Sequence, residues 1–353
     1  MATTRPHNVF LDSNVVIRAG KPPGGPLIAR LVDLVEAGYV KIVTTDLTRI
    51  EIAKKHASND FEIIGELSKK RVRALAHSIL QVELPEISAG ELHEKLLDTY
   101  NVSVADMFKK LRAVELSINN VIPLSVFHSY ARKSGIFAGD AKKEQFPDAF
   151  IFETIRVIAA KDDPLTIVSD DSDFDAAIRG AEHITRLNSI PDLFSKLGLT
   201  IETAPDVDAF VMNNRDSIID TVNDELNQFG LQVYDVEDAE IDEASVEDVT
   251  FSDLITFRTA RPGKEVLVVG RVEMDVKVSY RHPDWDTATW DNEDRVAIPH
   301  RNVEGERNIT VEADFNMTLN VDSGGKPTSI SEFTFNDDNF MWVSIAPNDL
   351  DYK

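Results

Sequence analysis

Four acidic residues in separate stretches of the chain are the side chains best suited to chemistry, since each one ends or opens an apolar run. They are Asp12, Glu51, Asp148 and Asp171. Carboxylates gathered at one edge of a sheet repel each other unless a divalent cation lies between them. Hard cations such as Mg²⁺ are held by carboxylates and water, and they often bring a phosphate substrate with them. The set therefore predicts a metal-dependent phosphodiesterase.

Each of these acids also has a purely structural interpretation. Asp12 could cap the helix that follows the first strand. Glu51 matches the last position of a capping box that starts at Thr48, in which the glutamate accepts a hydrogen bond from the backbone amide of the cap residue. Asp148 follows a proline and could be a first-turn acid that the helix dipole favours. The combination of the four positions is what favours a metal site over these local roles.

Strands that alternate with helices must position the acids. Residues 9–11 are β-prone and run into Asp12, and the apolar run 165–168 leads into the acidic segment 169–173. This alternation predicts an α/β fold with a parallel sheet and helices on both faces. Ligands of such folds bind at the carboxyl ends of the strands. Asp12 and Asp171 are expected to lie there.

The pattern changes after residue 200. We expect an α/β domain at residues 1–200 with a mainly helical insertion at about 58–133. Residues 201–250 are expected to form one helix, at 206–229, and an acidic linker, at 235–248. Apolar and polar residues then alternate with period two, which predicts a mainly antiparallel β domain over residues 251–353.

The net charge of −24 is unevenly distributed. Residues 1–200 carry 25 Lys and Arg against 27 Asp and Glu, whereas residues 201–353 carry 12 against 34. An electronegative surface repels phosphate backbones, so the first part is the expected nucleic-acid-binding part. The acidic second part is expected to be a regulator, an oligomerisation surface or a dock for a protein partner. Basic candidates for substrate binding, in stretches that are more often solvated helix faces, are Lys109, Lys110, Arg112, Lys142 and Lys143.

The composition also excludes some kinds of covalent bond, metal site and membrane segment. The chain has 0 cysteines, which excludes disulfides and cysteine-ligated zinc. No run of about 18 apolar residues is present, so that no membrane span is predicted. The first residues lack the apolar stretch of a secretory signal. We expect a cytoplasmic protein without membrane association.

Taken in order, the acidic segments resemble the four motifs of PIN-domain nucleases. The matching segments are Asp12 to Asn14, Glu51, Pro147 with Asp148, and Ser169 to Phe174. The resemblance covers roughly residues 7–200 and implies a three-layer α/β/α fold around a central parallel sheet. It also implies that the acids hold one or two Mg²⁺ or Mn²⁺ ions and that the domain cleaves RNA, or less often DNA.

The resemblance implies a role for each residue of the motifs. The four acids named first are the expected catalytic set, and the choice of Asp171 over Asp170 rests on the family pattern. The expected metal ligands are Asp12, Asp148, Asp171 and the auxiliary Asp173, and the expected supporting groups are Asn14 and Ser169. PIN-domain nucleases are often dimers, so the resemblance also leads us to expect a homodimer.

A metal-dependent endoribonuclease is the leading interpretation. Family association adds a biological context, namely a stress or phage-defence effector or toxin. Two alternatives stay open: a non-catalytic PIN-like scaffold that binds RNA or protein, and a nuclease for single-stranded DNA. Nothing in the sequence distinguishes one class of RNA from another, because base readout depends on surfaces that the sequence does not place.

Overall fold

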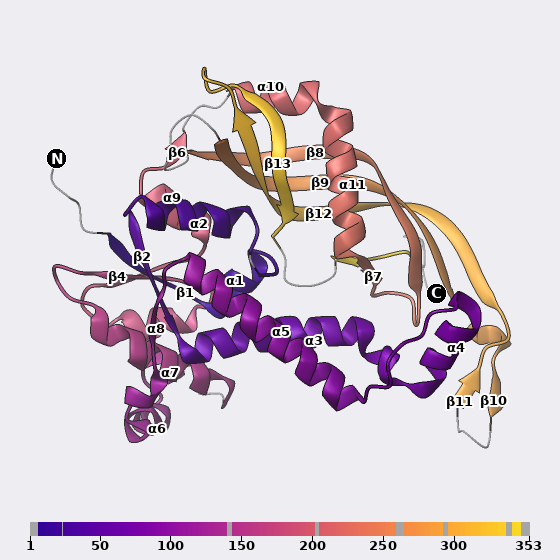
Figure 1. Ribbon diagram of the computed structural model, residues 1–353, viewed down its shortest axis with the longest axis horizontal. Coiled ribbons are helices and arrows are strands. Elements are labelled where there is room, and N and C mark those ends of the chain that lie inside the picture. Colours follow the sequence, from indigo (N-terminus) through magenta and orange to yellow (C-terminus); the bar gives the residue numbers. More distant parts are fainter. Residues whose placement is uncertain are drawn as a thin grey trace, which may run out of the picture. The chain divides into compact units, whose positions relative to one another are not determined.

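The chain folds into two compact units, which are shown in Figure 1. The computed structural model describes residues 6–22, 24–139, 143–201, 205–258, 265–291, 296–336 and 341–346. The first unit comprises Met1–Thr200 together with Phe257–Pro262, and the second comprises Ile201–Thr256 together with Gly263–Lys353. The two units are treated separately below.

A five-stranded parallel sheet forms the centre of the first unit, with strand order β3-β2-β1-β4-β5. The strands are β1 (His7–Leu11), β2 (Val40–Thr45), β3 (Val114–Leu116), β4 (Leu165–Val168) and β5 (Ile184–Leu187). The central strands are buried along almost their whole length, as expected for a parallel sheet that is covered on both faces. The predicted three-layer α/β/α fold is confirmed.

Figure 1 shows the α-helices of this unit, most of which flank the sheet, whereas the helix Lys70–Leu80 lies away from it. They are α1 (Ser13–Arg18), α2 (Pro26–Glu36), α3 (Asp46–Ile64), α4 (Lys70–Leu80), α5 (Ala89–Lys110), α6 (Pro123–Arg132), α7 (Phe146–Ile155), α8 (Asp173–Ile178) and α9 (Ile190–Lys196). The chain starts in the middle of the sheet, builds β2 and β3 on one side, and then crosses to β4 and β5 on the other. The strand order therefore reverses between β1 and β4, which is where doubly wound sheets bind ligands.

The segment predicted as a helical insertion contains more than helices. It holds the end of α3 and all of α4, α5 and α6, but it also supplies β3, which pairs with the last three residues of β2. The segment is mainly helical, but the sequence pattern did not reveal β3. Three residues are too short for a period-two pattern to be recognised.

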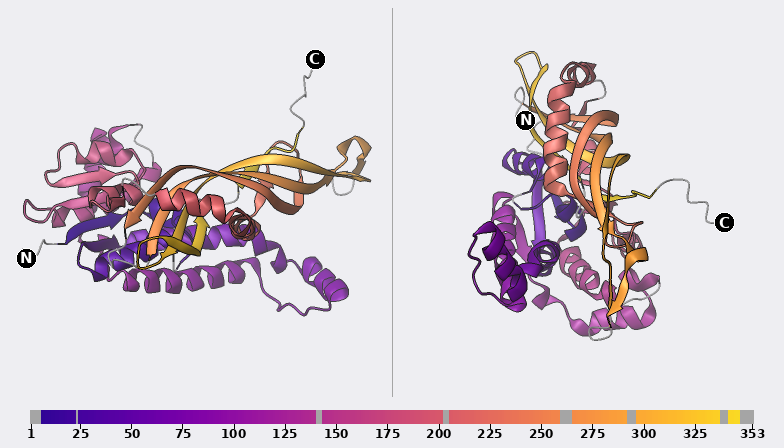
Figure 2. Two further views of the ribbon diagram at one scale, coloured as in Figure 1. Left: turned by 90° about the horizontal axis from the view of Figure 1, so that it is seen from above. Right: turned by 90° about the vertical axis from the view of Figure 1, so that its right-hand side faces the viewer.

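The second unit is built on an antiparallel sheet, as predicted, in which β9 and β12 pair over 19 positions from Asn302 opposite Pro283 to Asn320 opposite Glu265. Figure 2 shows how far these two strands extend and twist. The strands and helices of this part of the chain are β6 (Thr200–Ile201), α10 (Pro205–Asn213), α11 (Arg215–Phe229), β7 (Leu231–Val233), β8 (Glu240–Arg258), β9 (Glu265–Pro283), β10 (Thr289–Asp291), β11 (Val296–Ile298), β12 (Asn302–Val321), β13 (Pro327–Phe335) and β14 (Met341–Val343).

Helices α10 and α11 belong to the core of this unit rather than to a connection between domains. Ile218, Val222 and Leu226 of α11 are buried in the same apolar cluster as Val272 and Phe315 of the sheet. The single helix predicted for residues 206–229 is wrong, because the helix breaks at Asn214. The side-chain amide of Asn214 donates to the carbonyl of Phe210 at 2.8 Å, a local bond that competes with the helix.

The acidic linker predicted at residues 235–248 is also wrong over most of its length, since β8 begins at Glu240. Its acids lie on the solvent side of the strand, and Arg281 of β9 pairs with Glu240 and Asp242. The sequence pattern did not reveal the parallel pairing of β14 with β7.

The end of β8 returns to the first unit. The Phe257 ring is fully buried and lies edge-on to Phe194 of α9, with the ring centroids 5.4 Å apart. The backbone amide of Arg258 donates to the carbonyl of Leu199 at 2.8 Å. Among the described residues, none of the helices combines the length and the apolar character that crossing a bilayer requires.

Candidate functional site

The four acids predicted from the sequence are brought close together at the point where the strand order reverses. Asp12 follows β1 directly, Asp171 lies in the loop after β4, Glu51 lies in α3, and Asp148 is the third residue of α7. Their charges influence each other, since the carboxylates of Asp12, Glu51, Asp171 and Asp173 all raise the pKa of Asp148. Four segments thus contribute to one acidic cluster.

Asp12 is the most enclosed member of this cluster, with 2% of its surface exposed. One carboxylate oxygen accepts a hydrogen bond from the amide of Ser13 at 2.8 Å, and the other accepts one from Ser169 Oγ at 2.6 Å. Burial raises the pKa of Asp12, while these two hydrogen bonds lower it. The cap role and the cluster role coexist, because Asp12 is also the N-cap of α1.

Glu51 lies beyond the first turn of α3, so the capping-box interpretation is excluded. The N-cap is Thr45, whose Oγ1 accepts from the amide of Thr48 at 3.0 Å. Burial, and then the charge of Asp12, raise the pKa of Glu51 to about 7, against a hydrogen bond with Ser13 that lowers it. The Oε2 atom of Glu51 is buried and has no hydrogen-bond partner among the described residues.

Asp148 occupies the first turn of α7, as its alternative interpretation predicts, but the helix dipole does not dominate its titration. Burial, followed by the neighbouring acidic charges, raises the pKa of Asp148 to about 8. A half-buried carboxyl group close to four other acidic side chains is electrostatically unfavourable when it is ionised. This environment separates Asp148 from an ordinary first-turn acid.

The loop after β4 is ordered by its own hydrogen bonds. Ser169 Oγ accepts from the amide of Asp171 at 3.0 Å, and Asp171 Oδ1 accepts from the amide of Asp173 at 2.8 Å. Asp170 points to a different partner, because it forms an ion pair with Arg18 of α1. The structure therefore gives the two adjacent aspartates, Asp170 and Asp171, different surroundings.

Two residues that sequence reasoning missed hold this loop in place. Gln145 Nε2 donates to Asp173 Oδ2 at 2.5 Å. Arg186 of β5 donates to both carboxylate oxygens of Asp175, at 2.7 and 2.9 Å, and to the carbonyl of Ser169 at 2.7 Å. A charged residue inside the apolar run of β5 was the available signal for Arg186. Gln145 gave no comparable signal.

Asn14 and the basic candidates among the described residues are exposed at the surface. Asn14 is exposed in the first turn of α1. Lys109, Lys110 and Arg112 are exposed and precede β3, so they lie toward the amino ends of the strands, whereas the acids follow the carboxyl ends. Lys143 is exposed in the turn before α7, and Lys142 lies outside the described residues.

The donor chemistry of the cluster fits a divalent cation. The cluster offers the hard oxygen ligands that such an ion prefers. The ion would relieve the mutual repulsion of the carboxylates and would give the buried Oε2 of Glu51 a partner, which it lacks among the described residues. The coordination shell is not preformed, since no three His, Asp or Glu side chains in the described ranges lie close enough to ligate one ion. Binding would have to draw the carboxylates together.

A comparison with known protein families gives a match in the same part of the chain. Residues 9–174 match the family model of the PIN domain, a range that contains all four acids. Domains of this family are generally nucleases that use divalent metals. Neither a curated protein nor a solved structure matches the chain.

Proposed function

We propose, from the premise that residues 9–174 are a PIN domain, that the chain is a metal-dependent endoribonuclease that hydrolyses phosphodiester bonds of RNA. The observation that carries the proposal is the cluster of acids from four segments, in which burial and mutual repulsion raise the pKa values of Asp12, Glu51 and Asp148. Such a cluster is unfavourable without a cation, and perturbed groups of this kind gather at functional sites.

In this proposal Asp12, Asp148 and Asp171 hold Mg²⁺ or Mn²⁺, with Asp173 as an auxiliary ligand. When bound, the ion supplies Lewis acidity toward the phosphate and lowers the pKa of water. Ser13 and Ser169 fix the orientation of the Asp12 carboxylate through their hydrogen bonds. Gln145 does the same for Asp173.

We assign proton transfer to Glu51. Without metal, burial and then the charge of Asp12 raise the pKa of Glu51 to about 7. With the ion bound, its carboxylate would act as the base toward the attacking water. The products would be a 5′-phosphate and a 3′-hydroxyl, as the family resemblance implies. We also propose that Lys54, which is exposed and close enough to lower the pKa of Glu51, contacts a phosphate of the substrate.

Cleavage of labelled single-stranded RNA and DNA in Mn²⁺, Mg²⁺ or EDTA tests the proposal. We expect metal-dependent cleavage of RNA by the full chain, and its loss in Asp12→Asn and Asp171→Asn. Cleavage of DNA alone would favour the single-stranded DNA nuclease. Equal background in all three proteins, together with no thermal stabilisation by Mn²⁺, would favour the non-catalytic scaffold.

The wider context is part of the same proposal. A stress or phage-defence effector, or a toxin, would arrest growth when expressed, and an Asp148→Asn variant would not. A homodimer is expected from the family and is tested by sedimentation. A regulatory role of the acidic second unit predicts that activity depends on salt concentration, because interactions between exposed charges are screened by ions.

A further inference from the structure

An exposed aromatic ring lies next to the helix that carries Asp148. Phe127 of α6 is 53% exposed, and its ring packs against that of Phe146 with the centroids 5.0 Å apart. Phe146 is the first residue of α7 and precedes Asp148 by two positions, which is about 3 Å along the helix axis. Ile122 and Leu124 are exposed as well. An apolar surface that solvent reaches thus lies close to the acidic cluster.

Other aromatic rings hold Phe127 in place. Tyr130 of the same helix contacts Phe146 and Phe137, with centroid distances of 5.0 and 5.2 Å. Phe137 is fully buried and contacts Phe146 at 5.0 Å. Val126, the neighbour of Phe127 in the chain, is buried in the same apolar core. A ring held in this way loses little freedom when a ligand covers it, so the cost of ordering it on binding is small.

The segment that carries the ring lies at the same edge of the sheet as the acids. It follows the carboxyl end of β3, and Asp46, directly after β2, accepts a hydrogen bond from the amide of Ile118 at 3.1 Å. Helix α6 packs against α7, and the turn Gly135–Ala138 after it packs against α8 (Figure 1). These two helices carry Asp148 and Asp173. The ring is therefore on a part of the chain that contacts both.

The same segment is free of acidic residues, although the chain has a net charge of −24. Residues 117–139 contain no Asp and no Glu, and Arg132 and Lys133 are exposed among them. In the turn before α7, the exposed side chains of Lys143 and Glu144 balance each other in charge. Cations attract a phosphate backbone and acids repel it. A nucleic acid can therefore reach the acidic cluster over this surface.

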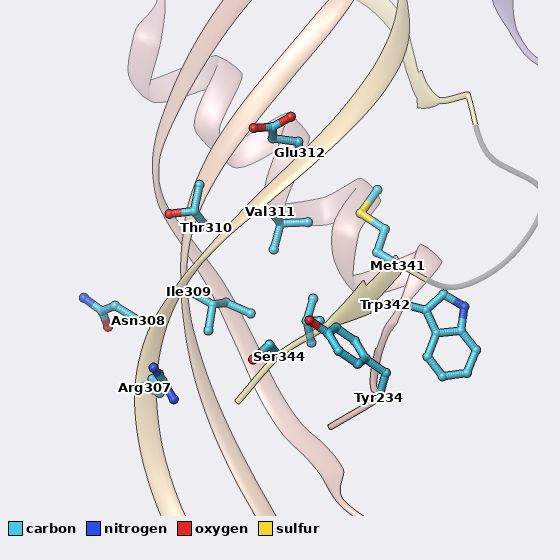
Figure 3. A pocket seen from close by; sticks show the side chains of 11 residues that line it. Tyr234, Arg307, Asn308, Ile309, Thr310, Val311, Glu312, Met341, Trp342 and Ser344 are labelled. Atoms are coloured by element: carbon cyan, nitrogen blue, oxygen red, sulfur yellow. The ribbon is translucent and has the colours of Figure 1, made fainter. Parts of the chain in front are cut away.

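Exposed aromatic side chains also line a groove of about 540 Å³ in the second unit, between β12 and β14. Figure 3 shows Tyr234 and Trp342 there. They belong to residues 201–353, which carry 12 Lys and Arg against 34 Asp and Glu. Arg307 in the same groove donates to the carbonyl of Ile345 at 2.5 Å. The excess of acids repels a phosphate backbone from this unit, which favours the surface of α6 as the nucleic-acid site.

We propose that Phe127 stacks on an unpaired base of a single-stranded RNA whose backbone crosses α6 toward the acidic cluster. The inference rests on the proposed function and names the form of its substrate. Every base has a π-face, so stacking on an aromatic ring binds single strands with little regard to sequence. In duplex RNA the bases are stacked on each other, and recognition of bases by stacking needs unpaired ones. A second copy of the chain could also cover an apolar ring, but it would not use the cations beside it.

The test uses the full chain and a fluorescein-labelled adenosine dodecamer, with binding followed by fluorescence anisotropy in EDTA, so that metal-dependent cleavage does not occur. The control ligands are the same strand in a duplex with a uridine dodecamer, and an abasic strand of the same length. Phe127→Leu removes the ring but keeps an apolar side chain, whereas Phe127→Trp enlarges the ring. Tyr39→Leu is the matched control, because Tyr39 is 46% exposed and directly precedes β2, at the opposite edge of the sheet.

We expect the adenosine strand to bind, and Phe127→Leu to weaken its binding by about fivefold or more, the scale of a lost stack between a base and an aromatic ring. Phe127→Trp should keep or strengthen binding, and Tyr39→Leu should leave it unchanged. The duplex and the abasic strand should bind more weakly. Circular dichroism confirms that the variants are folded; if Phe127→Leu is not, the comparison of abasic and intact strands on the wild-type chain decides.

Absence of binding, equal binding by Phe127→Leu and wild type, equal binding of the duplex, or a dimer in sedimentation that Phe127→Leu dissociates would overturn the proposal. Cleavage of the same strand in Mn²⁺ separates this result from the proposed function. A chain that cleaves RNA but binds it equally well without the ring remains a nuclease and lacks the stacking site. A chain that binds through Phe127 but cleaves nothing has the stacking site and is not a nuclease.

Discussion

Ser169 Oγ donates a hydrogen bond to Asp12 Oδ2 at 2.6 Å, although the two residues lie 157 positions apart. The bond joins the end of β1 to the loop after β4 across the reversal of strand order. The same Oγ accepts from the amide of Asp171 at 3.0 Å. One hydroxyl group thus sets the distance between two acids that are proposed to share an ion.

Ser169→Ala should weaken divalent metal binding. Removal of an outer hydrogen bond to a ligand typically reduces metal affinity 10- to 100-fold, so we expect the Mn²⁺ concentration for half-maximal thermal stabilisation to rise by about tenfold or more. Ser172→Ala is the matched control, because Ser172 is exposed in the same loop and caps α8 with no side-chain bond. Equal effects of the two substitutions would contradict the role of Ser169.

Asp170 and Asp171 should respond differently to the same substitution. Asp171→Asn removes a proposed ligand, so cleavage should fall by a factor of about 100 or more, the scale of a lost transition-state contact of roughly 3 kcal/mol. Asp170→Asn removes an exposed ion pair with Arg18, worth about 1 kcal/mol or less. Its activity should stay within a few fold of wild type. Reversed effects would move the assignment to Asp170.

Without metal, the protein should lose stability as pH rises. The pKa of Glu51 is raised to about 7 and that of Asp148 to about 8, so between about pH 4 and pH 8 the folded state binds more protons than the unfolded state. The free energy of unfolding therefore decreases with pH across this window. We expect the melting temperature in EDTA to be several degrees lower at pH 8 than at pH 5.

The same melting-temperature measurement can be made on a variant and with added metal. Asp148→Asn removes one of the repelling charges, so its melting temperature in EDTA should depend less on pH and exceed that of wild type at pH 8, while cleavage is lost. Saturating Mn²⁺ should abolish most of the pH dependence in wild type. A wild-type protein whose stability rises toward pH 8 in EDTA would refute the proposed repulsion.

Arg186→Lys should affect metal binding through the loop rather than through the substrate. Lysine keeps the charge but cannot make the bidentate bond to Asp175 together with the bond to the carbonyl of Ser169. We expect the half-saturating Mn²⁺ concentration to rise by about tenfold, with KM for RNA unchanged and kcat restored at saturating metal. Arg179→Lys, at an exposed position, is the control. A loss that metal does not restore would indicate a general structural defect.

The sequence was sufficient to predict the central strands and the acids that follow them. Parallel strands buried on both faces, such as β1 and β4, read as apolar runs, and a carboxylate directly after such a run lies at the edge where ligands bind. Asp12 and Asp171 could therefore be placed on a fold, whereas Glu51 and Asp148 lie in helices and were identified by the family pattern. The catalytic and metal-binding roles of these acids stay predictions.

Features that depend on tertiary contacts could not be predicted. β8 looked like a linker because its acids face solvent and pair with Arg281 of β9, a partner about 40 positions away. The cap of α3 is three residues earlier than the capping-box pattern indicated, since Thr45 and not Thr48 begins the helix. Gln145 was missed because its partner, Asp173, is distant in sequence.

The return of Phe257 to the first unit bears on how the chain is made. The first unit buries that ring against Phe194, so it lacks one of its core aromatic residues until the ribosome has passed residue 257, after α10, α11 and β8 have been synthesised. A nascent chain that stops at residue 200 would expose the apolar surface around Phe194. This order of synthesis would delay the mature first unit until much of the second unit has been translated.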